Sequence, residues 1–350
     1  MIRSPEEAGQ RMATDSLSHM RMPPRSLKVD GGERRVGVEL EFGALSAASG
    51  ADLVRRLFGG TIEQEDPHRF HIRGTRFGTF TSELDTQYAH RSTDEPGPPF
   101  ADADVFGGVL QTFRYGMREL YGDISSLLIP CEIVCPPVAL SDLPTLDALV
   151  DALAAAGAEG TRSSPLYAFG AQLNPEIATA DAAWIAAMLK AYLLLSDWLR
   201  AVIGLHMTRQ LVSFADPFPA AYVRLVVDPG YWPSLATLIR DYIDANPTRN
   251  RELDMLPLFA WLEGATVRER VQDKRVKARP TFHYRLPDAN IGVPAWGVTL
   301  EWNRWCVVER LAERRPVLDA MGTSFIDNSA RAAPENWALK ASEWLALLQV

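Results

Sequence analysis

Two carboxylates stand in the middle of a stretch that otherwise has the pattern of a buried strand, RVGVELEFGAL, residues 35–45. Side chains two residues apart in a strand share a face, so Glu39 and Glu41 lie on one face, between Gly37 and Gly43. The other face is entirely apolar. The pattern therefore predicts either a strand with one solvated face or a strand that carries a metal or acid–base site.

The same comparison of strand faces finds polar groups on one face of five further predicted strands. Each of these strands is apolar on its other face, and none of the stretches contains Lys, which is common on solvated faces. Six such strands predict a curved sheet whose concave side forms a polar cavity; a sheet with a solvated face is the alternative. The polar residues are Glu83 with Asp85, Glu132, Gln172 with Asn174, His283 with Arg285, and Glu301 with Asn303.

The carboxylates on this face would repel one another without cations, since a like-charge pair ~4 Å apart in a partly buried site costs several kcal/mol. Mg²⁺ prefers hard oxygen ligands of this kind and leaves positions open for phosphates. Arg285, and Arg279 six residues earlier, carry forked donors that suit phosphate groups. Carboxylates, a divalent metal and arginine together indicate phosphoryl transfer.

Several common catalytic motifs are absent from the sequence. There is no GxxxxGK[ST] phosphate loop, no GxGxxG fingerprint between a strand and a helix, no GxSxG elbow and no HExxH metal motif. These absences disfavour P-loop, dinucleotide-binding, α/β-hydrolase and zinc-protease chemistry. His206 and His283 are each interpreted as a hydrogen-bonded structural histidine or a site residue.

The elements that must position these residues are predicted from hydrophobic periodicity and turn signals. We expect an α+β fold with a mainly antiparallel sheet and helices on its outer face. Predicted strands cover residues 35–43, 61–66, 69–73, 76–89, 128–137, 165–174, 279–287 and 296–305. Predicted helices cover residues 51–57, 104–121, 146–153, 181–203, 234–245, 252–262, 305–320 and 335–348. Residues 1–32 form a predicted polar extension, and residues 33–350 a single domain with a helical insert at about 181–262.

The composition restricts the partners and the compartment that we expect. The formal net charge of −8 disfavours a general nucleic-acid-binding surface. Cys131, Cys135 and Cys306 are too few for a disulfide framework and lack a zinc spacing, so we expect core packing in the reducing cytoplasm. Charged residues interrupt the most apolar stretch, residues 182–204, which favours a buried helix over a membrane span. No secretory signal opens the sequence.

The segments GVELEF, SELD, EIVCPP, FGAQLNPE, RPTFHYRLP and TLEWNRW resemble the amidoligase family, over roughly residues 34–311. That family belongs to the carboxylate–amine ligases with the glutamine synthetase and glutamate–cysteine ligase fold. The resemblance implies a catalytic domain that binds ATP and two or three Mg²⁺ ions. It also implies that the metal ligands are Glu39, Glu41, Glu132 and Glu301, that the acidic strand pair is represented by Glu83 or Asp85, and that phosphate contacts come from Arg279 and Arg285.

The sequence departs from the family pattern at two places. Many relatives have an H-x-H pair where this chain has Gln172 and Asn174, so amide groups are expected to contribute to cofactor binding there. Many relatives also have E-x-R on the late strand, where this chain has Glu301 and Asn303.

The resemblance implies an ATP- and Mg²⁺-dependent ligase that joins a small-molecule or peptide carboxylate to an amine, through an acyl-phosphate, and releases ADP. Glu83, Asp85 and Arg285 are its expected catalytic residues, and no nucleic-acid or membrane partner is expected. Two alternatives use the same residues: a metal-dependent phosphatase or hydrolase, and a catalytically degenerate module that binds a nucleotide or a peptide. Neither the substrates nor the oligomeric state follows from the sequence.

Overall fold

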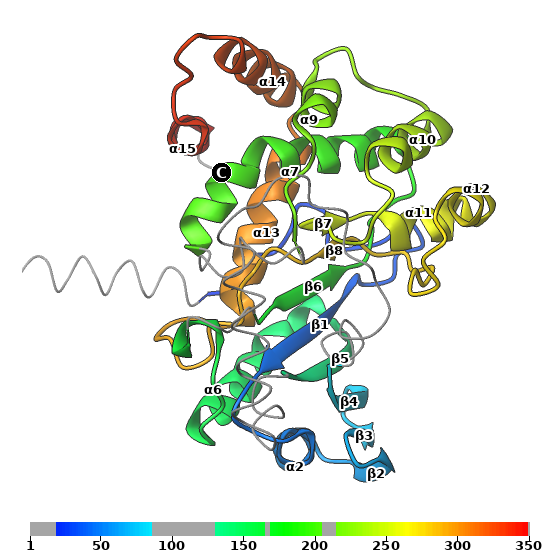
Figure 1. The fold of residues 1–350 in the computed structure, drawn as a ribbon, viewed down its shortest axis with the longest axis vertical. Coiled ribbons are helices and arrows are strands. Elements are labelled where there is room, and N and C mark those ends of the chain that lie inside the picture. The colour runs from blue at the N-terminus through cyan, green and yellow to red at the C-terminus, as the bar shows by residue number, and fades with distance from the viewer. Residues whose placement is uncertain (1–18, 86–129, 165–168, 205–214, 349–350) are drawn as a thin grey trace, which may run out of the picture.

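The computed structural model describes residues 19–85, 130–164, 169–204 and 215–348. The predicted helix at residues 104–121, part of the predicted strand at 165–174, and His206 lie outside the described residues. The described part of the chain is an α+β fold with one eight-stranded antiparallel sheet (Figure 1). The predicted fold class is confirmed at this level.

The strands of the sheet lie in the order β2-β3-β4-β5-β1-β6-β8-β7. The strand that opened the sequence argument, β1, is therefore near the centre of the sheet, with β5 and β6 as its neighbours. The strands are β1 (Arg35–Phe42), β2 (Thr61–Asp66), β3 (Arg69–Thr75), β4 (Gly78–Leu84), β5 (Cys131–Ala139), β6 (Ala171–Pro175), β7 (Leu253–Asp254) and β8 (His283–Tyr284).

The two faces of the sheet differ as the alternation predicted. Val36, Val38, Leu40 and Phe42 of β1 are fully buried on one face. Paired residues of the neighbouring strands continue this apolar face, because residues that are directly opposite in a sheet point to the same side. These residues include Ile72, Phe80, Ile133, Leu173 and Tyr284.

Helices cover the apolar face. α2 (Ala47–Phe58) packs beneath β3 and β4, and its N-terminus is capped by Ser46, whose side chain accepts a hydrogen bond from the Ser49 N–H. α13 (Val298–Ala312) places the Trp305 ring 5.5 Å from that of Phe282 and 5.3 Å from that of Tyr284, measured between centroids. These tilted aromatic contacts anchor α13 on the apolar side of β8.

The remaining helices form an outer layer and one edge. Figure 1 shows α9, α14 and α15 on the side of α7 that faces away from the sheet. It shows α10, α11 and α12 near the β7 edge of the sheet. Their bounds are η1 (Leu140–Leu146), α6 (Asp147–Ala155), η2 (Thr161–Ser163), α7 (Ala182–Ile203), α9 (Ala220–Val227), α10 (Leu235–Ala245), α11 (Leu256–Leu262), α12 (Gly264–Arg270), α14 (Arg315–Ser329) and α15 (Trp337–Leu348).

The long helix α7 is the core helix that its composition predicted. It is the one helix among the described residues that is long and apolar enough to cross a membrane, and most of it is buried inside the protein. Asp181 caps it by accepting a hydrogen bond from the Trp184 N–H, and Gly204 ends it in the left-handed conformation that glycine adopts without strain. The helices predicted at residues 234–245 and 335–348 are present as α10 and α15.

The strand predicted at residues 296–305 is wrong, because this segment begins helix α13. The apolar residues Val298, Trp302 and Trp305 recur at helical spacing, and they face the core. The alternation of Leu300 and Trp302 with polar residues satisfied the strand pattern by coincidence.

Other elements also differ from the prediction, and the strand predicted at residues 279–287 is reduced to the two residues of β8. The single helix predicted at residues 305–320 is two helices, because the chain breaks after Ala312 and Pro316 opens α14. The helix predicted at 252–262 begins with β7, and only its second half is helical, as α11. The short helices α9 and α12 were not predicted.

Candidate active site

A row of three glutamates crosses the middle of the sheet on its polar face. The register pairs Glu83 of β4 with Glu132 of β5, and Glu132 with Glu41 of β1. Neighbouring strands lie about 4.8 Å apart and opposed side chains point the same way, so the three carboxylates are adjacent. Glu39 lies two residues along β1 on the same face, beside Gln172 of β6. We call Glu39, Glu41, Glu83 and Glu132 the acidic row.

The charges of the acidic row act on one another. Burial raises the pKa of Glu132 well above its ordinary value, and the charges of Glu39, Glu41, Asp85 and Glu83 raise it further. A carboxylate in this position holds a proton or needs a neighbouring cation. The arrangement therefore favours binding of a positive ion against Glu132.

Polar groups of β6 and the loop before it hold the two glutamates of β1. The Gly170 N–H donates a 2.7 Å hydrogen bond to Oε2 of Glu41, and Nδ2 of Asn174 donates a 2.9 Å hydrogen bond to Oε1 of Glu39. Gln172 and Asn174 are both buried on this face. The predicted amide pair thus lies in direct contact with, or beside, the predicted metal ligands.

The far side of the polar face carries His283, which strand alternation predicted to lie there with Arg285, and an aspartate, Asp254, which was not predicted. His283 of β8 is opposite Asp254 of β7, with its Nδ1 3.7 Å from Oδ2 of Asp254. Its Nε2 is 4.0 Å from Oε2 of Glu39. Asp254 is completely buried, and its Oδ2 is also 3.7 Å from Nε of Arg249. These separations are longer than hydrogen bonds.

Several buried polar atoms of this face therefore lack a hydrogen-bond partner among the described residues. They are Gln172 Oε1, His283 Nε2, Asp254 Oδ2 and Arg249 Nε. Native proteins leave few such atoms unsatisfied, and those that occur concentrate at sites that bind a ligand, an ion or water. Unsatisfied buried atoms also occur elsewhere among the described residues, for example Glu301 Oε2, but these four lie together on the face of the acidic row, which indicates a binding site.

Arginine side chains border the acidic row on both sides. Arg285 is almost fully buried and donates a 2.6 Å hydrogen bond to the Arg249 carbonyl. Burial lowers the pKa of Arg285, while the charges of Asp254, Glu39 and Glu41 oppose this, so its guanidinium lies within electrostatic reach of the row. On the other side, Arg69 of β3 forms an ion pair with Glu83.

The other predicted residues occupy different positions. Asp85 is buried just after β4, where its N–H donates a 2.9 Å hydrogen bond to the Pro130 carbonyl, and it shares the face of Glu83. Arg279 is exposed in the loop before β8, outside the sheet.

Glu301 lies apart from the acidic row. It is on α13, the helix that covers the apolar face of the sheet, rather than on a strand. It is completely buried, accepts a 2.9 Å hydrogen bond from Trp296 Nε1, and forms a 2.5 Å ion pair with Arg304. Asn303 also belongs to α13, where its Oδ1 accepts a 2.7 Å hydrogen bond from the Arg21 N–H.

The carboxylate oxygens of the acidic row suit a hard cation, although these side chains do not surround a single point. Nowhere in residues 19–85, 130–164, 169–204 and 215–348 do three His, Cys, Asp or Glu side chains converge closely enough to enclose a metal ion. Mg²⁺ commonly takes only one or two carboxylates and completes its octahedron with water and substrate phosphates. Glu39, Glu41 and Glu132 fit that role.

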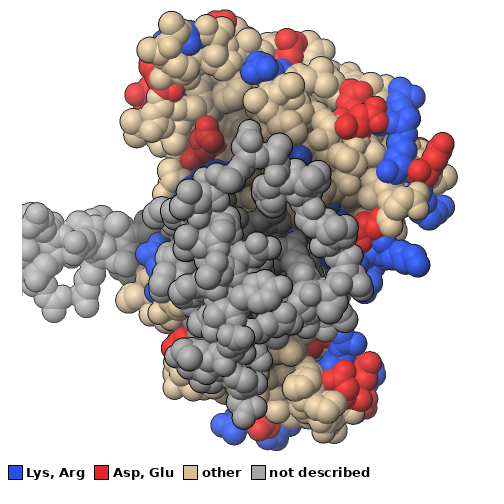
Figure 2. Space-filling view, in the orientation of Figure 1, with Lys and Arg blue, Asp and Glu red and all other residues tan. Residues whose placement is uncertain are grey.

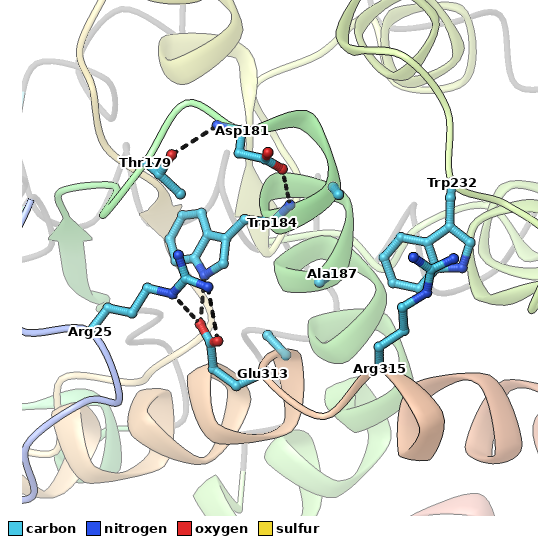
Figure 3. Close-up of a pocket in the computed structure, with 10 residues that line it drawn as sticks. Arg25, Thr179, Asp181, Trp184, Ala187, Trp232, Glu313 and Arg315 are labelled. Atoms are coloured by element: carbon cyan, nitrogen blue, oxygen red, sulfur yellow. Dashed lines mark hydrogen bonds and ion pairs between the residues drawn. The ribbon is translucent and has the colours of Figure 1, made fainter. Parts of the chain in front are cut away.

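A pocket of about 380 Å³ opens on the helical side of the protein, between Trp184 and Trp232 (Figure 3). Arg25 forms a two-pronged ion pair with Glu313, at 2.6 and 3.0 Å, and Trp184 Nε1 donates a 2.9 Å hydrogen bond to the same carboxylate. These polar groups satisfy one another, and none of the predicted site residues lines this pocket.

The three cysteines are buried and unpaired by disulfides, as predicted. Burial raises the pKa of Cys131 to about 11 and raises that of Cys135 further. Thiols in this condition are protonated and unreactive at neutral pH.

The sequence does carry a signal for Asp254. In RELDML, residues 251–256, Glu252 and Asp254 alternate with apolar residues, which is typical of a strand with one polar face. The helix predicted over residues 252–262 hides this short alternation.

A family model described as "Putative amidoligase enzyme" matches residues 32–307 of the chain. The matched range contains the acidic row, the amide pair, His283 and Arg285. Comparison with curated proteins and with solved structures gives no match.

Proposed function

Because the chain belongs to the amidoligase family, we propose that it is an ATP- and Mg²⁺-dependent ligase that joins a carboxylate to an amine through an acyl-phosphate. The observation that carries this proposal is the polar face of the sheet. That face carries adjacent carboxylates from β4, β5 and β1. It also carries buried, unsatisfied polar atoms from β6, β7 and β8, and a buried arginine, Arg285. Phosphoryl transfer needs positioning and charge compensation, and these groups are suited to both.

Each group has a distinct role in the proposal. Glu39, Glu41 and Glu132 would hold Mg²⁺, which when bound supplies positive charge to the phosphate tail of ATP. Asn174 orients Glu39, and the Gly170 N–H orients Glu41. Gln172 contributes an unsatisfied carbonyl oxygen to the cofactor. Glu301 is left out of this metal set because it lies on α13.

Arg285 is the proposed contact for the phosphoryl group in transfer. Its guanidinium is buried within reach of Glu39 and Glu41, where a fixed positive charge acts in a low dielectric. Arg279, exposed at the entrance to β8, would contact phosphate from outside. Glu83 and Asp85, at the opposite end of the row, are the proposed acceptors of a proton from the attacking amine.

The reaction is proposed to run in two steps. The substrate carboxylate attacks the γ-phosphorus of ATP, so that a new C–O–P linkage forms while the bond to the β-phosphate oxygen breaks and ADP leaves. The amine then attacks the acyl carbon, and inorganic phosphate leaves with one oxygen of the original carboxylate. Activation is required because an unactivated carboxylate would have to expel oxide.

The test follows heavy oxygen from the carboxylate. Amino acids and acidic dipeptides labelled with ¹⁸O in their carboxylates are incubated with the protein, ATP, Mg²⁺ and simple amines, and the products are analysed by mass spectrometry. We expect ADP and one labelled oxygen in inorganic phosphate for each amide formed. AMP carrying the label would contradict the acyl-phosphate, and phosphate release without an amine would identify a phosphatase or hydrolase instead.

A further inference from the structure

A short basic segment flanks the β7 edge of the polar face in a chain whose overall charge is negative. Residues 268–279 contain six Lys or Arg residues and two acidic residues, whereas the whole chain has a formal net charge of −8. Figure 2 shows Lys and Arg side chains at the right-hand edge of the molecule, where Figure 1 places α12 and the loop that follows it.

Four of these cations are available to a partner. Arg270 pairs with Asp244, and Arg275 pairs with Asp273. The other four are exposed and have no ion pair with any described residue; we call them the basic edge, and they are Arg268, Lys274, Lys277 and Arg279.

The basic edge is continuous with the polar face in two ways. Along the chain, Arg279 precedes His283 by four residues, which an extended backbone spans in roughly 14 Å. Through space, the Arg279 N–H donates a 3.0 Å hydrogen bond to the carbonyl of Pro257 in α11, three residues after Asp254. A bound chain could therefore run from the basic edge onto the polar face.

We propose that the basic edge binds an acidic peptide segment, so that the carboxylate substrate of the polar face is part of a larger polyanionic polypeptide. This inference rests on the proposed ligase function, which requires a carboxylate as one substrate. Separate cations along a loop suit separate Asp or Glu side chains, and complementary charge would guide the segment toward the site.

An acidic peptide fits this surface better than a nucleic acid does. Glu269 and Asp273 both lie between Arg268 and Lys274 in the sequence, and the rest of the chain is acidic. A continuous phosphate backbone would meet these negative charges along its length, whereas peptide side chains can adapt to them.

The test measures binding separately from turnover. The probe is a fluorescein-labelled oligoglutamate peptide, followed by fluorescence anisotropy at rising salt, with an oligoglutamine peptide and a single-stranded oligodeoxythymidylate of equal length for comparison. We expect wild-type protein to bind oligoglutamate preferentially, with affinity that falls as salt rises. Stronger binding of the oligonucleotide, or equal binding of oligoglutamine, would overturn the proposal.

Matched charge-reversal variants locate the surface. The triple variant Arg268→Glu, Lys274→Glu, Lys277→Glu should raise the Kd for oligoglutamate about tenfold, because three weak exposed attractions become repulsions. The control variant Arg56→Glu, Arg224→Glu, Arg331→Glu changes the net charge equally at exposed positions elsewhere. Equal weakening in both variants would show a general charge effect and contradict a defined surface. Thermal unfolding of both variants verifies that they fold.

Failure of this inference differs from failure of the ligase proposal. Glu41→Gln, in the acidic row, should bind oligoglutamate as wild type does while losing Mg²⁺-dependent ATP turnover. Peptide binding without any ATP turnover in wild type would contradict the ligase alone, and turnover without peptide binding would contradict the basic edge alone.

Discussion

Two regions of this protein bury charged side chains, and they differ in how those charges are compensated. Where α13 packs against the start of β1, Arg34 and Glu309 form a fully buried, two-pronged ion pair at 2.7 and 2.8 Å. Trp305 Nε1 and two backbone carbonyls complete its hydrogen bonds. On the polar face, like charges are adjacent and several buried polar atoms have no partner among the described residues.

The difference separates structure from function. Buried charges that satisfy one another fix the position of a helix and offer nothing to a ligand. Uncompensated charges cost free energy in the isolated protein, and a fold retains them where a ligand or an ion supplies the missing partner. Glu132 of the acidic row belongs to the second kind, because burial and its acidic neighbours raise its pKa.

The largest expected effect comes from breaking the compensated pair. Arg34→Met leaves Glu309 buried without its partner, so we expect the free energy of unfolding to fall by ~3–5 kcal/mol in urea denaturation. The double variant Arg34→Met, Glu309→Met should recover much of this loss. Arg55→Met, which removes one partner of an exposed ion pair on α2, is the control and should change stability little. A small loss in Arg34→Met would contradict the comparison.

Relief of repulsion in the acidic row should have the opposite sign. Glu132→Gln removes the carboxylate whose pKa the fold raises, so the variant should be more stable than wild type at neutral pH. A raised folded-state pKa stabilises at low pH, and that contribution is lost as pH increases. The advantage of the variant should therefore grow as pH rises above 4.5, the ordinary value for Glu.

Urea denaturation across this pH range measures the difference. Glu343→Gln, at an exposed position on α15, serves as the matched control and should show no such trend. If Glu132→Gln were less stable than wild type at every pH, the charge of Glu132 would be stabilising in the folded protein. That result would contradict the difference drawn between the two regions.

Sequence reasoning was most successful where one strand face is buried. Alternation in β1, β4 and β5 predicted the acidic row, because burying Val38, Leu40 and Ile133 forces their neighbours to the other side. Family resemblance then supplied the chemistry that alternation alone left open.

It was least successful where helical and strand spacing coincide, or where partners are distant in sequence. Glu301 met a strand pattern yet lies on α13, and Asp254 was hidden inside a predicted helix. Arg34 and Glu309 are separated by 275 positions, so only the packing of α13 against the sheet brings them together.

Lys190 is a buried charge intermediate between the Arg34–Glu309 pair and the acidic row, and we expect it to have a smaller effect on stability. This completely buried lysine donates one 2.7 Å hydrogen bond to the Asp228 carbonyl and lies 4.4 Å from the centre of the Trp232 ring. Burial lowers its pKa from 10.5 to about 8. Between these values the unfolded chain holds more protons than the folded one, so stability rises with pH through this range.

The variant Lys190→Met lacks this titration. We expect the stability of wild type relative to Lys190→Met to increase between pH 8 and pH 10.5, as followed by urea denaturation. A difference that stays constant across the range would show that Lys190 is as well compensated as Arg34.

Titration calorimetry with Mg²⁺ and ATP tests the central claim most directly, because it compares one glutamate from each region. Glu41 lies in the acidic row, and Glu301 lies on α13, where its Oε1 accepts hydrogen bonds from Trp296 and Arg304. We predict that wild type binds ATP in a Mg²⁺-dependent manner, that Glu41→Gln raises the Kd at least about tenfold, or 1.4 kcal/mol, and that Glu301→Gln leaves it unchanged. Unaltered binding by Glu41→Gln, or loss of binding in Glu301→Gln alone, would contradict the assignment of the site to the polar face.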